Sequence, residues 1–111
     1  MLEINTVTVG PALVCSFKGR IDNTTSTRAE RQLKELTCHL QDSGIVFDLS
    51  ELTFCSSAGL RVFLLAGREA KANDNRLALC GLQDGVREVF KVSGFDELFP
   101  IHEDERSAVA A

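Results

Sequence analysis

Hydrophobic and polar positions divide the chain into short β-like runs separated by helix-like stretches. Residues 2–9 are rich in β-branched side chains, and residues 12–17 place apolar side chains at every second position. Gly10-Pro11 between the two runs suits a turn. Two such runs around a turn predict an antiparallel strand pair.

A polar break at residues 18–25 follows this pair and contains several residues that suit helix caps. Beyond the break, apolar residues recur at steps of four, three and four, the spacing of one helix face. They are Ala29, Leu33, Leu36 and Leu40. The spacing predicts a helix over about residues 24–42, and Ser43-Gly44 suits its end.

The middle of the pattern is the stretch over residues 45–68. Its first five residues, Ile45-Val46-Phe47-Asp48-Leu49, fit a strand buried on both faces, as in a parallel sheet. A short connection at residues 50–54 leads to Cys55-Ser56-Ser57-Ala58-Gly59. Apolar residues then recur at helical spacing, so a second helix is expected to begin near Ser57.

The last third of the chain continues the alternation of strand and helix. Residues 77–82 suit another buried strand, and a short helix follows with Ser93-Gly94 as its C-terminal cap. Residues 98–102 suit a last strand, in which Pro100 implies an edge or a strand end. Acidic residues from 103 onward can begin a final helix.

The expected order is therefore β-β-α-β-α-β-α-β-α. It predicts a single α/β domain over residues 1–111, with a mixed sheet, an antiparallel N-terminal pair and helices packed against the sheet. Strand–helix–strand connections from Ile45 onward should be right-handed crossovers, which put the start of the second helix at the carboxyl edge of the sheet. The segment that leads into the first helix, residues 22–25, also follows a strand, so we expect it at the same edge, close to Ser57.

Ser56 and Ser57 lie where a strand passes into a helix whose first amide N–H groups have no partner within the helix. One interpretation is that either serine caps the helix. The other is that a hydroxyl is displayed at a place able to hold a phosphate, because a helix N-terminus favours anions.

Composition narrows the class of protein. The 111 residues are 44% hydrophobic and 25% charged, which is ordinary for a soluble globular domain. The net charge of −4 argues against nucleic acid or an anionic membrane as the main partner. No apolar run reaches the ~20 residues that span a bilayer, and the N-terminus has no signal pattern, so we expect a cytoplasmic protein.

Candidate chemistry is sparse. The four cysteines form no C-x-x-C pair, which indicates neither a zinc site nor a thioredoxin-like motif. We expect free thiols and no disulfide, no bound metal and no cofactor. With two histidines and neither Tyr nor Trp, the chain is poorly equipped for catalysis, and we expect no enzymatic activity.

Against this background, residues 48–61, DLSELTFCSSAGLR, resemble the central motif of STAS domains, specifically of bacterial anti-sigma-factor antagonists. The Gly19-Arg20-Ile21-Asp22-Asn23 break before a helix resembles the family as well, and so does the stretch over residues 86–97 with its Phe-x-x-Ser-Gly-Phe core. The resemblance covers nearly the whole chain. Ser56 replaces an Asp that is frequent in the family, and Ala58 replaces a Ser or Thr.

The resemblance implies partner switching. An antagonist of this kind binds an anti-sigma factor that is also a serine kinase of the GHKL ATPase class, and the sigma factor is released. The kinase phosphorylates one serine, which maps onto Ser57, and a metal-dependent serine phosphatase resets the antagonist. The residues implied to contact the partner are Asp22, Asn23, Ser56, Ser57, Ala58, Gly59 and Arg61. Asp22 and Asn23 could equally cap the first helix.

Three alternatives remain at this stage. The same fold could bind protein as an adaptor without a phosphorylation cycle, in a lipid-transport or transporter-associated system. A small hydrolase or transferase could use Ser57 or Cys55, but no Gly-x-Ser-x-Gly turn is present and neither histidine can be placed beside a nucleophile. A nucleotide-binding module is disfavoured because the chain lacks a Gly-rich strand-to-helix loop.

Overall fold

The structure is a computed structural model that describes residues 1–110. Its sheet has five strands in the order β1-β2-β3-β4-β5, and β1 is antiparallel to β2 while the remaining neighbours are parallel. The strands are β1 (Leu2–Val9), β2 (Ala12–Ile21), β3 (Gly44–Cys55), β4 (Arg76–Cys80) and β5 (Ile101–His102). The expected mixed sheet with an antiparallel N-terminal pair is confirmed.

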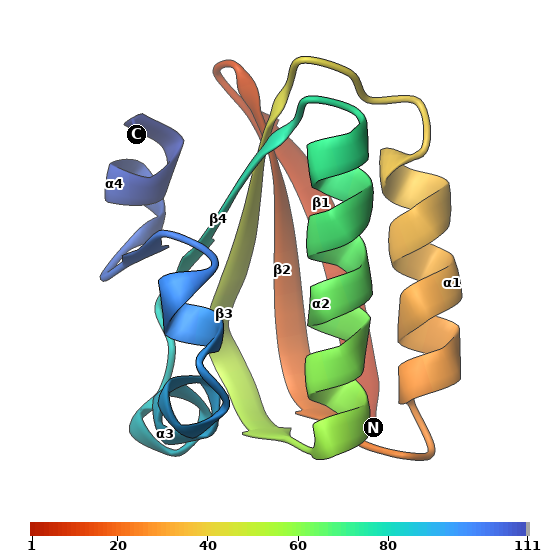
Figure 1. The fold of residues 1–111 in the computed structure, drawn as a ribbon, viewed down its shortest axis with the longest axis vertical. Helices are drawn as coiled ribbons and strands as arrows, with labels where there is room; N and C mark the ends of the chain where they lie inside the picture. The colour runs from red at the N-terminus through yellow and green to blue at the C-terminus, as the bar shows by residue number, and fades with distance from the viewer. Residues whose placement is uncertain (111) are drawn as a thin grey trace.

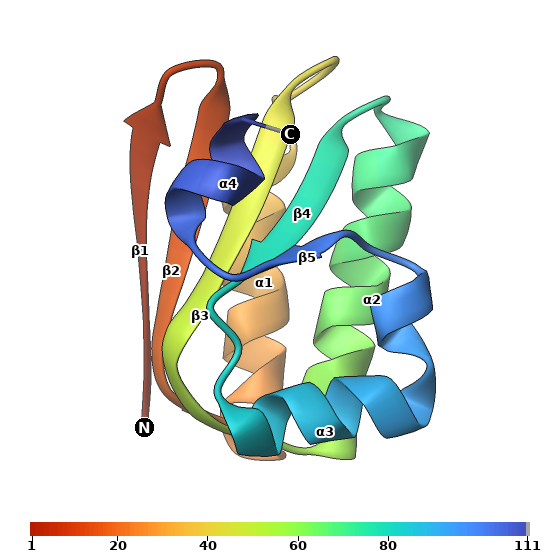
Figure 2. The same ribbon diagram turned by 90° about the vertical axis from the view of Figure 1, so that its left-hand side faces the viewer.

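The helices are distributed over both faces of this sheet. They are α1 (Ser26–Thr37), α2 (Ser57–Ala72), α3 (Asp84–Ser93) and α4 (Glu105–Ala110), with a 3₁₀ turn, η1 (Phe95–Glu97), after α3. In Figure 1, α1 and α2 lie side by side on one face, and Figure 2 shows α4 on the opposite face. The expected element order is confirmed. No helix of residues 1–110 is long and apolar enough to cross a bilayer.

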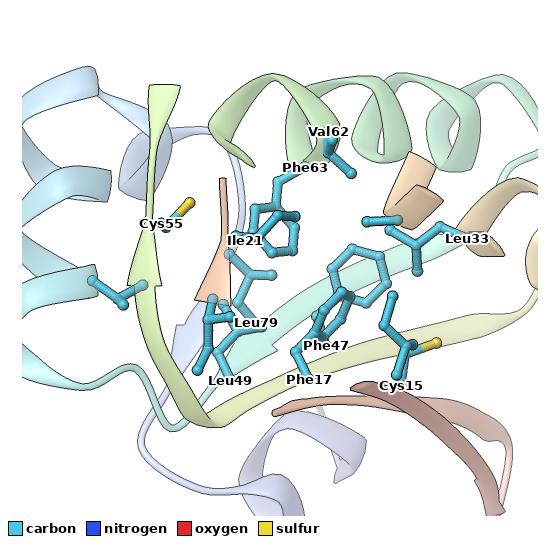
Figure 3. Packing of buried hydrophobic residues seen from close by; sticks show 14 of the residues in the cluster. Cys15, Phe17, Ile21, Leu33, Phe47, Leu49, Cys55, Val62, Phe63 and Leu79 are labelled. Atoms are coloured by element: carbon cyan, nitrogen blue, oxygen red, sulfur yellow. The ribbon is translucent and has the colours of Figure 1, made fainter. Parts of the chain in front are cut away.

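An aromatic cluster fills the core between the sheet and the α1–α2 layer (Figure 3). The centroid of the Phe63 ring on α2 lies 5.3 Å from the ring centroid of Phe17, 5.8 Å from that of Phe47 and 5.6 Å from that of Phe90. All four rings are at most 1% exposed. Phe63 therefore joins α2 to two strands and to α3, and this packing holds α2 against the sheet.

Two strands are longer than the sequence pattern predicts. β2 continues through the first half of the expected polar break to Ile21, and β3 runs without interruption to Cys55 through the expected connection at residues 50–54. Both expectations were wrong at these ends. Gly19 pairs with Leu2 on one side and with Leu52 on the other, so neighbouring strands on both sides supply backbone hydrogen bonds that local polarity does not reveal.

α1 is shorter than the expected helix over residues 24–42, and it ends at Thr37. The side chain of Asn75, which is 8% exposed, holds the following segment in a different conformation. Its Nδ2 donates to the Leu40 carbonyl at 3.1 Å, and its Oδ1 accepts from the Ser43 amide at 2.9 Å. Because these contacts span more than thirty residues, the helical periodicity does not predict them.

β4 and β5 are also shorter than expected. Gly94, with φ 83°, ends α3 as the C-terminal cap predicted for it.

All four cysteines are free thiols, as the sequence predicts. Cys15, Cys55 and Cys80 are buried, and burial raises the pKa of each thiol to about 12. Cys38 is exposed after α1.

Since the thiolate is the reactive form, we expect an aromatic disulfide reagent at pH 8 to react rapidly with one thiol of the native protein, and with all four thiols after denaturation. Rapid reaction of two or more native thiols would contradict the buried positions.

Candidate functional site

The start of α2 separates the roles of the two serines. Ser56 is the N-cap residue, with extended backbone (φ −85°, ψ 177°), and its Oγ accepts a hydrogen bond from the Gly59 amide at 3.2 Å. Ser57 is the first residue of the helix and is exposed. Its hydroxyl makes no hydrogen bond within residues 1–110. Ser56 therefore caps α2, and Ser57 displays a free hydroxyl at its N-terminus.

The segment that leads into α1 lies beside this point. The Ser56 amide donates to the carbonyl of Ile21, the last residue of β2, at 3.0 Å. Asp22 and Asn23 follow directly, so the N-terminal ends of α1 and α2 meet at the carboxyl ends of β2 and β3 (Figure 1, bottom). The expectation that the two helices begin at one edge of the sheet is confirmed. Whether these residues contact a partner stays a prediction.

Asp22 organises the turn that precedes α1. Its Oδ1 accepts hydrogen bonds from the Thr24 hydroxyl at 2.7 Å, from the Thr24 amide at 2.9 Å and from the Thr25 amide at 3.3 Å. These bonds lower the pKa of Asp22, and the bonds from Thr24 have the largest effect. The carboxylate therefore stays ionised near neutral pH. The N-cap residue of α1 is Thr25 rather than Asp22 or Asn23. The cap role considered for the latter two is therefore wrong, and Asn23 is exposed.

Gly59 is buried, and its role is packing. A Cβ atom at this position would lie 2.7 Å from Ile21 Cγ2 and 2.9 Å from Cys55 Sγ. Only glycine lets the first turn of α2 approach the ends of β2 and β3 this closely. Gly59 thus presents no side chain to a partner, whereas Ser57 is exposed and Ala58 is half-buried beside it.

Phe54 is a feature of this region that the sequence pattern did not predict. Its ring is 39% exposed, and the Arg20 guanidinium carbon lies 4.3 Å from the ring centroid. Simple alternation would place Phe54 on the buried face with Leu52. The pairing with β2 instead shifts between Gly19 and Arg20, so that one residue of β3 is skipped and the side-chain alternation is broken.

Arg61 completes what we call the helix-start surface, which consists of Asp22, Asn23, Phe54, Ser57 and Arg61. Arg61 is exposed and follows Ser57 by four residues, which places it one turn further along the same helix face. The first turn of α2 contains no acidic residue. The surface thus combines an anion, a cation, an aromatic ring and a free hydroxyl.

This arrangement suits modification and binding better than nucleophilic catalysis. Burial raises the pKa of the nearby Cys55 thiol to about 12, which makes it a poor nucleophile. His39 follows the C-terminal end of α1, at the opposite end of the helix layer from Ser57 (Figure 1), and His102 lies on the edge strand β5, two strands from β3, so the fold places neither histidine next to Ser57 as a base. No group of three or more His, Cys, Asp or Glu residues within residues 1–110 could hold a metal ion. An added phosphate at Ser57, in contrast, would meet free amide groups of the helix.

Comparison with known proteins identifies relatives in fold and sequence. The family model for STAS domains matches residues 3–108. A protein of Bordetella bronchiseptica, "Putative anti-sigma factor antagonist BtrV", is 42% identical over 102 residues that cover 89% of this chain and 84% of that protein. The anti-sigma F factor antagonist of Paenibacillus polymyxa is 28% identical over 97 residues, covering 87% of this chain and 83% of that protein.

Solved structures share the same architecture. The crystal structure of an anti-sigma factor antagonist from Mycobacterium paratuberculosis superposes with a TM-score of 0.89 at 19% identity, covering 99% of this chain and 92% of that chain. The Bacillus protein SpoIIAA in its phosphorylated form superposes with a TM-score of 0.71 at 20% identity, covering 99% and 97%.

Proposed function

This chain belongs to the STAS domain family, and from that premise we propose that it is an anti-sigma factor antagonist switched by phosphorylation of Ser57. Its partner is an anti-sigma factor that is also a serine kinase of the GHKL class. The observation that carries the proposal is the exposed Ser57 hydroxyl, free of any capping bond, at the start of α2 and adjacent to the start of α1. The similarity to the Bordetella antagonist supports the general role, and the phosphorylated SpoIIAA supports the switch.

In the unphosphorylated state, the helix-start surface binds the kinase, which then releases its sigma factor. Phe54, three residues before Ser57, supplies exposed apolar area, while Asp22 and Arg61 supply one charge of each sign. Asn23 follows Asp22 in the sequence, Ser56 and Ala58 flank Ser57, and the buried Gly59 packs the first turn of α2 against the ends of β2 and β3. Aromatic and Arg side chains are frequent among residues that dominate binding energy in interfaces.

Phosphorylation reverses this binding by local chemistry. The Ser57 Oγ attacks the γ-phosphorus of ATP, the bond between that phosphorus and the bridging oxygen of ADP breaks, and the hydroxyl proton passes to a base that the kinase supplies. The product carries roughly −1.5 to −2 charge at a position that was neutral. Because the helix N-terminus tolerates an anion, the domain keeps its fold while the surface becomes unsuited to the partner. A metal-dependent serine phosphatase removes the phosphate.

Incubation of the chain with its cognate kinase and ATP, followed by peptide mass spectrometry, tests the proposal. We expect one phosphate per chain, on Ser57, together with loss of the complex in size-exclusion chromatography. Phosphate on Ser56 would move the site by one residue. Stable binding of a partner without any phosphorylation would favour the adaptor function instead.

A further inference from the structure

Arg61 is an exposed cation that no carboxylate neutralises in the part of the chain that the structure describes. The single salt bridge of residues 1–110 joins Lys18 to Glu51, at 3.9 Å. Arg20, the other arginine near the start of α2, is stacked on the Phe54 ring. Arg61, four residues after Ser57 on α2, is therefore an exposed cation without an ion-pair partner among these residues.

The helix places this guanidinium within reach of a group on Ser57. Residues four apart on an α-helix are neighbours on its surface, with Cβ atoms about 5–6 Å apart. An anion at the first position and a cation four residues later is the favourable orientation, because it also matches the helix dipole. Neither side chain is buried, so both can rotate to meet.

The negative charge of Asp22, in the segment before α1, also favours an orientation of the Ser57 phosphate toward Arg61. Asp22 lies beside the start of α2, since it follows the Ile21 carbonyl that accepts the Ser56 amide. Its carboxylate is held in place by Thr24 and Thr25 and stays ionised. A dianionic group on Ser57 is therefore repelled from the α1 side and attracted toward α2. The two effects act together.

We propose that Arg61 is the intramolecular partner of phosphorylated Ser57 and forms a charge-assisted pair with the phosphate oxygens. The pair rests on the proposed phosphorylation of Ser57. Phosphorylation then changes two charges of the helix-start surface at once: it adds the phosphate and withdraws the Arg61 cation from the kinase. The surface of the kinase that faces Arg61 in the unphosphorylated complex is accordingly acidic.

The phosphate's second ionisation reports this pair directly. The chain is made with phosphoserine inserted at position 57 during translation, so that no kinase is needed, and the ³¹P resonance is followed between pH 4 and 9. A nearby cation favours the dianion. Arg61→Gln should therefore raise the phosphate pKa by about 0.5 unit at low salt, as expected for charges about 5 Å apart in water. The difference should shrink in 1 M salt.

Two matched variants make the test specific. Arg68→Gln removes an exposed arginine about three turns from Ser57 along the same helix and should leave the titration unchanged. Arg20→Gln tests the other nearby arginine and should also leave it unchanged. An Arg61→Gln titration that coincides with the unsubstituted chain, or a shift produced by Arg20→Gln instead, overturns the pair. Kinase labelling at a residue other than Ser57 would defeat the proposed function while this titration still reports on the pair.

Discussion

Ser57→Ala should abolish phosphorylation by the cognate kinase and lock the chain in its kinase-bound state. The substitution removes the hydroxyl to which the phosphoryl group is transferred, while Ser56 keeps the cap because its Oγ still accepts the bond from the Gly59 amide. Since alanine is a good helix former, the free energy of unfolding should change by less than about 0.5 kcal/mol. Incorporation of phosphate from radiolabelled ATP measures phosphorylation, and size-exclusion chromatography measures binding to the kinase.

Two further variants control for this result. Ser57→Glu introduces one negative charge and should weaken kinase binding by about tenfold or more, although a carboxylate only partly imitates a phosphate. Ser56→Ala removes the cap and should lower the free energy of unfolding by about 0.5–2 kcal/mol while Ser57 is still labelled. Full labelling of Ser57→Ala would show that the acceptor lies elsewhere.

Phe63→Ala should produce the largest loss of stability, about 3–5 kcal/mol in the free energy of unfolding. The ring is 1% exposed and contacts the rings of Phe17, Phe47 and Phe90. Its removal leaves a cavity under α2 that the surrounding strands cannot close. Because a domain of this size is stabilised by only about 5–15 kcal/mol, the loss is a large share of the total. Urea denaturation followed by circular dichroism measures the change.

The matched control is Val92→Ala on α3. Val92 is 79% exposed, so its truncation should change the free energy of unfolding by less than about 0.5 kcal/mol. A loss below about 1 kcal/mol for Phe63→Ala would contradict the packing role assigned to that ring. Kinase labelling of the folded fraction should be retained, because Phe63 lies beneath α2 and away from Ser57.

The order of strands and helices was predictable because periodicity is a local property. Apolar runs and helical spacing are written in consecutive residues, and they correctly located the core of each element, including the start of α2 near Ser57. The chain topology then placed the starts of α1 and α2 on one edge of the sheet, because parallel strands bring their carboxyl ends together. This much of the candidate site followed from the sequence.

The limits of β2, β3 and α1 were not predictable from local pattern. Each depends on a partner distant in sequence: Gly19 pairs with both Leu2 and Leu52, and Asn75 holds the segment after α1. A polar residue in a strand and a polar residue in a loop look alike until the neighbouring strand is known. Pairing with neighbouring strands decided the ends of β2 and β3, and hydrogen bonds to the distant Asn75 side chain hold the segment after α1 out of the helix.

Within the site, the sequence determined which chemical groups are available, and the tertiary structure determined which of them are exposed. Two adjacent serines left the cap and the free hydroxyl interchangeable; the bond from the Gly59 amide to Ser56 assigned them. The sequence pattern placed Phe54 in a connection before the helix; β3 in fact includes it, and the shifted register between β2 and β3 leaves its side chain exposed. The physical reason is common to both cases: exposure and hydrogen bonding depend on where the rest of the backbone lies, which consecutive residues do not encode.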